Sequence, residues 1–152
     1  MLNKLHCFQR ISIWLILIYA FTSFVDGQKK QIRVAVYDDN GGGGRGSDNV
    51  ELCLLEDTTF FTKRVSADEI RLGGLNSFDV VVQAGGSGSK QAKTLEDSGI
   101  DSIRQFIFRG GGYLGICAGA YLSTVEYKWS LGILNANVID REHWNRGGGI
   151  VK

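Results

Sequence analysis

The sequence contains no proline and almost no excess of either charge. Its 17 lysines and arginines are matched by 16 aspartates and glutamates, for a formal net charge of +1 at pH 7. Such a balance gives no electrostatic preference for nucleic acid or for an anionic surface, so we expect neither as a partner. Glycine is abundant at 21 residues, but the glycines gather in a few loops and form no repeat. The composition therefore indicates a globular chain and excludes a repetitive one.

Histidine and cysteine are scarce, with two and three residues. No cluster of histidine, cysteine and carboxylate residues has the spacing of metal ligands, so the sequence predicts no metal site. A glycine-rich run at residues 41–47 lacks the Gly-Lys-Ser/Thr ending of a Walker loop. Its backbone amides offer a cradle for an anion, but we interpret the run as a flexible surface loop. We expect no cofactor.

The N-terminus differs in kind from the rest of the chain. Lys4 and Arg10 precede an apolar run at residues 11–25, and a plausible cleavage point follows at Gly27. A basic start, a short apolar centre and a cleavable end are typical of a secretory signal peptide. The run is also shorter than the roughly 20 apolar residues that a spanning helix needs. We predict a signal peptide over residues 1–27, export to the periplasm or the medium, and no stable membrane association after cleavage; an uncleaved membrane anchor is the alternative.

Cleavage would remove Cys7 and leave Cys53 and Cys117. Two cysteines in an oxidising compartment can pair. Cys53, however, falls in a predicted amphipathic helix at residues 50–55, where a free cysteine is usually a small core residue. We therefore expect two unpaired thiols, with Cys53 buried.

Three runs rich in β-branched and aromatic residues predict strands at residues 32–37, 58–65 and 78–83. The first and third are apolar at their centres, as in strands that are covered on both faces. Each run is followed by a stretch with helical features. This alternation predicts one α/β domain built on a parallel sheet, with the first strand near its centre.

The predicted helices have recognisable starts. The first follows an N-cap at Asp48 or Asn49, and the second begins at a capping box formed by Ser66 and Glu69. The third covers residues 95–109, where an apolar stripe recurs at helical spacing. It ends at a run of three glycines, which favours a helix C-terminus.

The stretch around Cys117 organises the chain. Residues 113–116 predict a short buried strand, and the small residues after Cys117 predict a helix from about 118 to 125 that packs closely on it. Gly115-x-Cys117-x-Gly119 is the cysteine form of a nucleophile elbow, in which a Cβ at either glycine would collide with neighbouring backbone. The thiol would lie at the positive end of a helix dipole, which favours the thiolate. Cys117 is therefore the candidate nucleophile.

At these residues the sequence resembles the class I glutamine amidotransferase-like superfamily. Within it, Gly-Ile-Cys-Ala-Gly-Ala-Tyr-Leu at residues 115–122 is most similar to the domain at the N-terminus of some biotin-protein ligases and in free-standing bacterial proteins. The resemblance covers residues 32–152 and implies a flavodoxin-like, three-layer sheet, so we assign residues 28–152 to this domain. We expect no biotin ligation from this chain, because no ligase module is present in it.

The resemblance also implies an oxyanion hole. In these families a Gly-Gly turn after the third strand supplies one of its amides, and Gly85 and Gly86 match that turn. We assign the N–H groups of Gly86 and Ala118 as the donor pair, because glycine lets the backbone approach a substrate oxygen closely. The alternative is that residues 85–89 form only a surface turn.

The general base and its acid are missing from the pattern. In the relatives a His-x-Glu pair lies well downstream of the elbow, whereas here His143 follows Glu142 and precedes Trp144. We interpret His143 as a surface residue. Residues 129–139 predict a further strand, and residues 150–152 resemble the start of another. We therefore expect an incomplete domain, truncated at its C-terminus.

Three functions remain open on this sequence. The first is a cysteine-dependent amide or acyl hydrolase or transferase whose histidine and acid lie beyond this chain. The second is a non-catalytic domain that binds a small carboxylate, amide or anion. The third is a redox role for an exposed Cys117 thiol. Each of the first two implies a small-molecule substrate or ligand.

Overall fold

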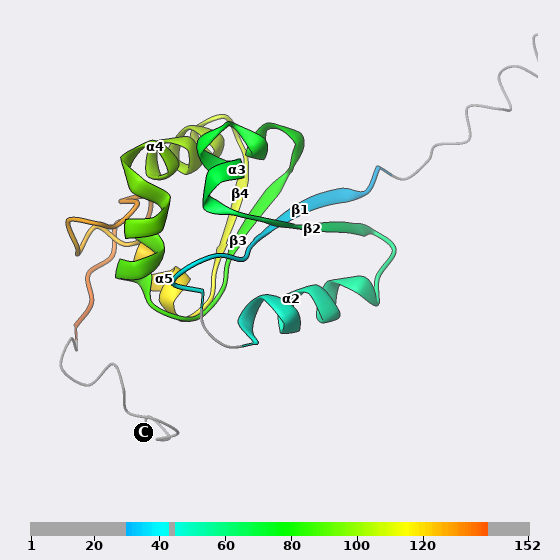
Figure 1. Cartoon of the computed structure of the whole chain (residues 1–152), viewed down its shortest axis with the longest axis horizontal. Helices are drawn as coiled ribbons and strands as arrows, with labels where there is room; N and C mark the ends of the chain where they lie inside the picture. The colour runs from blue at the N-terminus through cyan, green and yellow to red at the C-terminus, as the bar shows by residue number, and fades with distance from the viewer. Residues whose placement is uncertain (1–29, 43–44, 140–152) are drawn as a thin grey trace, which may run out of the picture. The chain divides into compact units, whose positions relative to one another are not determined.

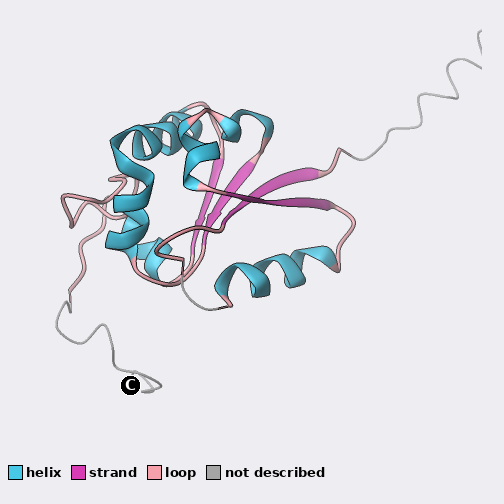
Figure 2. Cartoon of the chain, in the orientation of Figure 1, coloured by secondary structure: helices cyan, strands magenta, loops and turns pink. Residues whose placement is uncertain are grey.

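Four parallel strands form the sheet, in the order β2-β1-β3-β4 (Figures 1 and 2). They are β1 (Ile32–Tyr37), β2 (Phe60–Val65), β3 (Val80–Gln83) and β4 (Gly112–Gly115). The computed structural model describes residues 30–42 and 45–139. The predicted parallel α/β sheet is confirmed, with β1 inside it because both β2 and β3 pair with that strand.

Helices cover both faces of the sheet, which gives the three layers (Figure 1). They are α2 (Gly46–Leu55), α3 (Ala67–Arg71), the 3-10 helix η1 (Gly74–Ser77), α4 (Gly88–Phe108) and α5 (Ala118–Ser123). One face packs on α2 through Val34, Val36 and Val82. The opposite face, which includes Ala35 and Val81, packs on α3, α4 and α5. This architecture is consistent with the flavodoxin-like fold.

The capping box that opens α3 is confirmed. The Ser66 hydroxyl accepts a hydrogen bond from the Glu69 backbone N–H at 3.2 Å, and the Ser66 backbone N–H donates to the Glu69 carboxylate at 2.9 Å. The two residues thus satisfy amides that the first helical turn leaves without partners.

The start of α2 and the burial of Cys53 differ from the prediction. The helix begins at Gly46, so Asp48 lies in its first turn and is not the N-cap. Asp48 instead pairs with Arg64 of β2 at 2.6 Å. Cys53 is an exposed free thiol, because the face of α2 that meets the sheet is formed by Val50 and Leu54.

Helix α4 begins seven residues before the predicted start. It runs from Gly88 and consists of two helical segments that meet at a kink at Glu96, whose φ of 57° and ψ of 177° are not helical. The prediction captured only the part after this kink. Glycine has low helix propensity, so Gly88 did not indicate the start of a helix in the sequence.

Strand β4 is an edge of the described sheet and is only partly covered. Leu114 is 50% exposed, which corrects the prediction of a buried strand at residues 113–116. Leu114 aligns with Val82 on β3, so its side chain lies on the face that α2 covers. Within residues 45–139, α2 packs over β1 and β2 rather than over β4.

Residues 129–139 form no strand, contrary to the prediction. The backbone N–H groups of Leu131, Ile133 and Leu134 donate to carbonyls of Leu122 and Ser123 at the end of α5. The Arg104 guanidinium on α4 donates to the carbonyls of Ser130 and Leu131. Leu131 is therefore buried in the core without any sheet pairing, so its apolar character did not indicate a strand.

The predicted signal peptide at residues 1–27, His143 and the predicted strand start at residues 150–152 lie outside the described residues. Within the described ranges, no helix is long and apolar enough to cross a membrane.

Candidate functional site

Cys117 occupies the tight turn between β4 and α5. Its backbone has φ of 53° and ψ of −108°, in a region that side-chain-bearing residues rarely adopt. Residues held in such conformations store about 1–3 kcal/mol of strain, and they concentrate at functional sites. The Cys117 thiol is exposed and free, so the strained turn presents a sulfur to solvent at the end of the strand.

Two glycines make this turn possible. A Cβ at Gly115 would lie 2.6 Å from the Gly119 carbonyl oxygen, and a Cβ at Gly119 would lie 2.0 Å from the Gln83 carbonyl oxygen. Both distances are shorter than any tolerable contact, so α5 can pack on β3 and β4 only with glycine at both positions. The sequence predicted this steric role for Gly115 and Gly119, and the contact distances agree with it.

Tyr113 on β4 also fixes the first turn of α5. Its hydroxyl donates to the Gly119 carbonyl at 2.8 Å. Burial raises the pKa of the Tyr113 hydroxyl above its usual value, so this group stays protonated and remains a donor at neutral pH. The predictions did not include Tyr113, although a tyrosine four residues before the candidate nucleophile was visible in the sequence.

The turn that follows β3 lies directly against the thiol. A Cβ at Gly85 would be 3.6 Å from the Cys117 Cβ and 4.0 Å from its Sγ. The structure therefore brings Gly85 and Cys117 together, as expected for loops at the carboxyl ends of neighbouring parallel strands. Gly86 has φ of 135°, a conformation that favours glycine.

The amides of Gly86 and Ala118 are free donors within the part of the chain that the structure describes. Neither N–H group has a hydrogen-bond acceptor there. Gly86 follows the residue that contacts the thiol, and Ala118 follows Cys117 itself. Ala118 is thus adjacent to Cys117 in sequence and Gly86 is adjacent to the glycine beside Cys117, and neither amide has an acceptor among the described residues.

The glycine-rich loop after β1 supports the Gly85-Gly86 turn. The Ser87 N–H donates to the Gly41 carbonyl at 2.8 Å, and Gly42 lies opposite Gly86 in an antiparallel bridge. A Cβ at Gly41 would fall 2.3 Å from the Gln91 backbone nitrogen. Gly41 and Gly42 therefore pack against the turn, while Gly42 is exposed, as predicted for a surface loop.

No described residue is a histidine, since His6 and His143 both lie outside the ranges that the structure describes. A proton acceptor of that type for Cys117 is therefore not part of the described site. Among the same residues, no group of three or more histidine, cysteine, aspartate or glutamate side chains is arranged to hold a metal ion.

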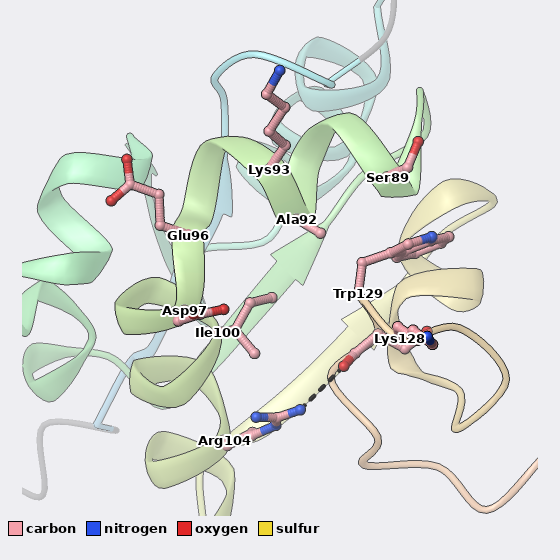
Figure 3. Close-up of a pocket in the computed structure, with 10 residues that line it drawn as sticks. Ser89, Ala92, Lys93, Glu96, Asp97, Ile100, Arg104, Lys128 and Trp129 are labelled. Atoms are coloured by element: carbon pink, nitrogen blue, oxygen red, sulfur yellow. Dashed lines mark hydrogen bonds between the residues drawn. The ribbon is translucent and has the colours of Figure 1, made fainter.

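A pocket of about 420 Å³ lies near the turn, between α4 and the segment after α5 (Figure 3). Gly88 lies between the pocket and the Cys117 turn. A Cβ at Gly88 would lie 3.0 Å from the Trp129 ring, which lines the pocket, and 3.1 Å from the Ala118 carbonyl oxygen. Trp129 stacks on Tyr127 with ring centroids 4.5 Å apart. Figure 3 shows Lys93 pointing away from the space between Trp129 and α4. The lining residues are Ser89, Ala92, Lys93, Glu96, Asp97, Ile100, Arg104, Lys128, Trp129 and Ser130.

The sequence matches the family described as biotin-protein ligase, N terminal, over residues 32–145. This match spans most of the chain. The chain belongs to the biotin-protein ligase N-terminal family. The domain is therefore glutamine amidotransferase-like and related to biotin-protein ligase, as the pattern around Cys117 predicted. No curated protein sequence matches the chain.

Proposed function

We propose that Cys117 is the nucleophile of an amide or acyl hydrolase or transferase built on this glutamine amidotransferase-like domain. The observation that carries the proposal is the strained backbone of Cys117, with φ of 53°, which holds an exposed thiol against the Gly85 turn. A structural cysteine gains nothing from such a conformation, whereas a nucleophile elbow requires it. Gly115 and Gly119 are the elbow glycines in this proposal.

The chemistry follows from the groups around the sulfur. The Cys117 thiolate attacks the carbonyl carbon of an amide or ester, and the carbonyl oxygen becomes an oxyanion. The N–H groups of Gly86 and Ala118 donate to that oxyanion, which stabilises the transition state. The tetrahedral intermediate expels an amine or alcohol, which takes a proton from a general acid, and a thioester remains on Cys117. Water or an acceptor amine then releases the acyl group and restores the thiol.

The proton acceptor in this proposal comes from outside the described residues. A cysteine nucleophile of this kind usually shares its proton with a histidine that a carboxylate orients. Cysteine is nevertheless intrinsically nucleophilic, so a substrate with a good leaving group tests Cys117 without a complete set of catalytic partners.

The experiment is ester hydrolysis with p-nitrophenyl acetate by the protein and by two matched variants. We expect a rapid burst of p-nitrophenol from the parent and from Cys53→Ser, and no burst from Cys117→Ala. The two cysteines are both exposed free thiols, so Cys53→Ser controls for nonspecific thiol chemistry. Equal release by the parent and by Cys117→Ala would contradict the proposal.

A non-catalytic binding domain is the second candidate. It is favoured by the absence of histidine from residues 30–42 and 45–139. In that case the free amides of Gly86 and Ala118 bind a small carboxylate or other anion, and the thiol is dispensable. Titration of the Cys117→Ala variant with acetate, followed through the Gly86 amide resonance, separates the two functions, because only the binding domain tolerates loss of the thiol without loss of function.

A further inference from the structure

Two buried glutamines at the end of β3 lack hydrogen-bond partners. Gln83 and Gln91 are both 0% exposed. Within the described residues, the Gln83 side chain has no partner for either Nε2 or Oε1, and Gln91 has none for Oε1. An unpartnered buried polar group destabilises a fold. Three such atoms in one region therefore require an explanation.

Both side chains lie on the same side of the sheet. Val81 packs in the core that α4 and α5 share with the sheet. Because side chains alternate along a strand, Gln83 projects to that same face. Gln91 is a buried residue of α4, and its Nε2 donates to the Ala84 carbonyl at 3.0 Å. Gln91 therefore reaches the backbone of the residue that directly follows Gln83, behind the turn that carries Gly85 and Gly86.

The first turn of α5 covers the Gln83 side of this region. A Cβ at Gly119 would lie 2.9 Å from the Gln83 Cβ, so α5 packs directly over the glutamine. Any partner of the three orphaned atoms is therefore enclosed and small. Two of the atoms are acceptors, Oε1 of Gln83 and Oε1 of Gln91, and the third is a donor. A single water molecule has two hydrogens and a lone pair to match them, and internal waters typically make about three hydrogen bonds.

We propose that Gln83 and Gln91 bind one internal water molecule and that this water connects β3 to α4 behind the Gly85-Gly86 turn. The water donates to the two Oε1 atoms and accepts from Nε2 of Gln83. Gln83 and Gln91 are thus positioning residues for the turn that lies against Cys117. The inference deepens the proposed function, but its tests detect the turn and the water and need no catalysis.

The first test is the sign of the stability change in Gln83→Met, which keeps the unbranched shape and removes the amide. If the atoms of Gln83 are bound to water, the unfolding equilibrium constant rises about tenfold, because the substitution removes two hydrogen bonds and leaves the Gln91 Oε1 orphaned. If those atoms have no partner, the substitution stabilises the protein, and that result overturns the proposal. Gln105→Met, on the exposed side of α4, is the matched control and should change little.

The second test is nuclear magnetic resonance on nitrogen-15-labelled Cys117→Ala protein, in which no chemistry at the thiol is possible. We expect a cross-peak between the Gln83 side-chain amide protons and a long-lived water. We also expect faster hydrogen exchange of the Ser87 amide, which donates to the Gly41 carbonyl at 2.8 Å, in Gln83→Met than in Gln105→Met. Absence of the water cross-peak overturns the binding site. Unchanged Ser87 exchange overturns the positioning role. Neither result depends on whether Cys117 proves to be a nucleophile.

Discussion

Gly119 contacts Gln83 so closely that a Cβ on the glycine would lie 2.0 Å from the Gln83 carbonyl oxygen. The atom in the way is backbone in a central strand, so it cannot move aside as a flexible side chain would. Gly119→Ala should therefore force α5 away from β3. We expect a loss of unfolding free energy of about 3 kcal/mol, at the upper end of ordinary overpacking, measured by urea denaturation.

Gly110→Ala is the control for that substitution. Gly110 also has a positive φ, of 97°, but nothing lies within 4 Å of its Cβ position. Only backbone strain opposes an alanine there, at a cost of about 1 kcal/mol. Equal losses in Gly119→Ala and Gly110→Ala would show that close packing of α5 on β3 is not what Gly119 provides.

Cys117 should be replaceable by glycine with a gain in stability. A residue with a Cβ is strained at φ of 53° and ψ of −108°, and glycine relieves that strain. We expect the free energy of unfolding of Cys117→Gly to be about 1 kcal/mol higher than that of Cys117→Ala. Urea denaturation measures the difference. A gain in stability from removing a candidate functional residue is the behaviour expected where function maintains strain.

At Cys53, glycine should lower the stability relative to alanine, which is the opposite of the effect expected at Cys117. Cys53 lies inside α2, which spans Gly46–Leu55, where glycine is a poor helix former. Cys53→Gly should therefore be less stable than Cys53→Ala, by about 1 kcal/mol. If Cys117→Gly is also less stable than its alanine counterpart, the backbone of Cys117 is not strained in solution.

The Ser47–Asp38 pair should make stability depend on pH. The Ser47 hydroxyl donates to the Asp38 carboxylate at 2.7 Å, and this bond together with Arg64 holds the pKa of Asp38 below its usual value. A carboxyl group whose pKa is lower in the folded state stabilises the fold above its unfolded pKa of about 3.9, and that stabilisation is lost as the pH falls.

Ser47→Ala should remove part of this stabilisation. We expect the variant to lose about 1 kcal/mol at pH 7, and the difference from the parent to shrink as the pH falls below about 4. Thermal unfolding across a range from about pH 2.5 to about pH 7, which extends well below and well above that pKa, measures the effect. Ser102→Ala is the control, since that side chain has no hydrogen bond among the described residues. A difference that stays constant with pH would argue against the Asp38 contribution.

The parts of the fold that were predictable depend on local chemistry. The run of β-branched residues at 32–37 marks β1 at its observed bounds, because an interior parallel strand must be apolar over consecutive residues. Ser66 and Glu69 mark α3 because a capping box is satisfied within four residues. Gly115 and Gly119 were predictable because a sharp strand-to-helix turn leaves no room for a Cβ.

The parts that were missed depend on contacts between distant residues. Leu131 and Ile133 resemble a strand, but the end of α5 satisfies their backbone amides instead. Gly41 resembles a loop residue with no constraint until Gln91 is found 2.3 Å from its Cβ position. The orphaned amide atoms of Gln83 cannot be inferred from sequence at all, because they depend on how α5 closes over β3.

The proposed role of Cys117 as the nucleophile is tested most directly by the site of acylation in the intact protein. Cys53 and Cys117 are both exposed thiols in one chain, so each molecule contains its own control. After a brief reaction with p-nitrophenyl acetate, peptide mapping by mass spectrometry gives the acetylated fraction of each cysteine. We expect Cys117 to be acetylated at least about tenfold faster than Cys53, which corresponds to roughly 1.4 kcal/mol of transition-state stabilisation by the site. Equal rates, or faster acetylation of Cys53, would contradict it.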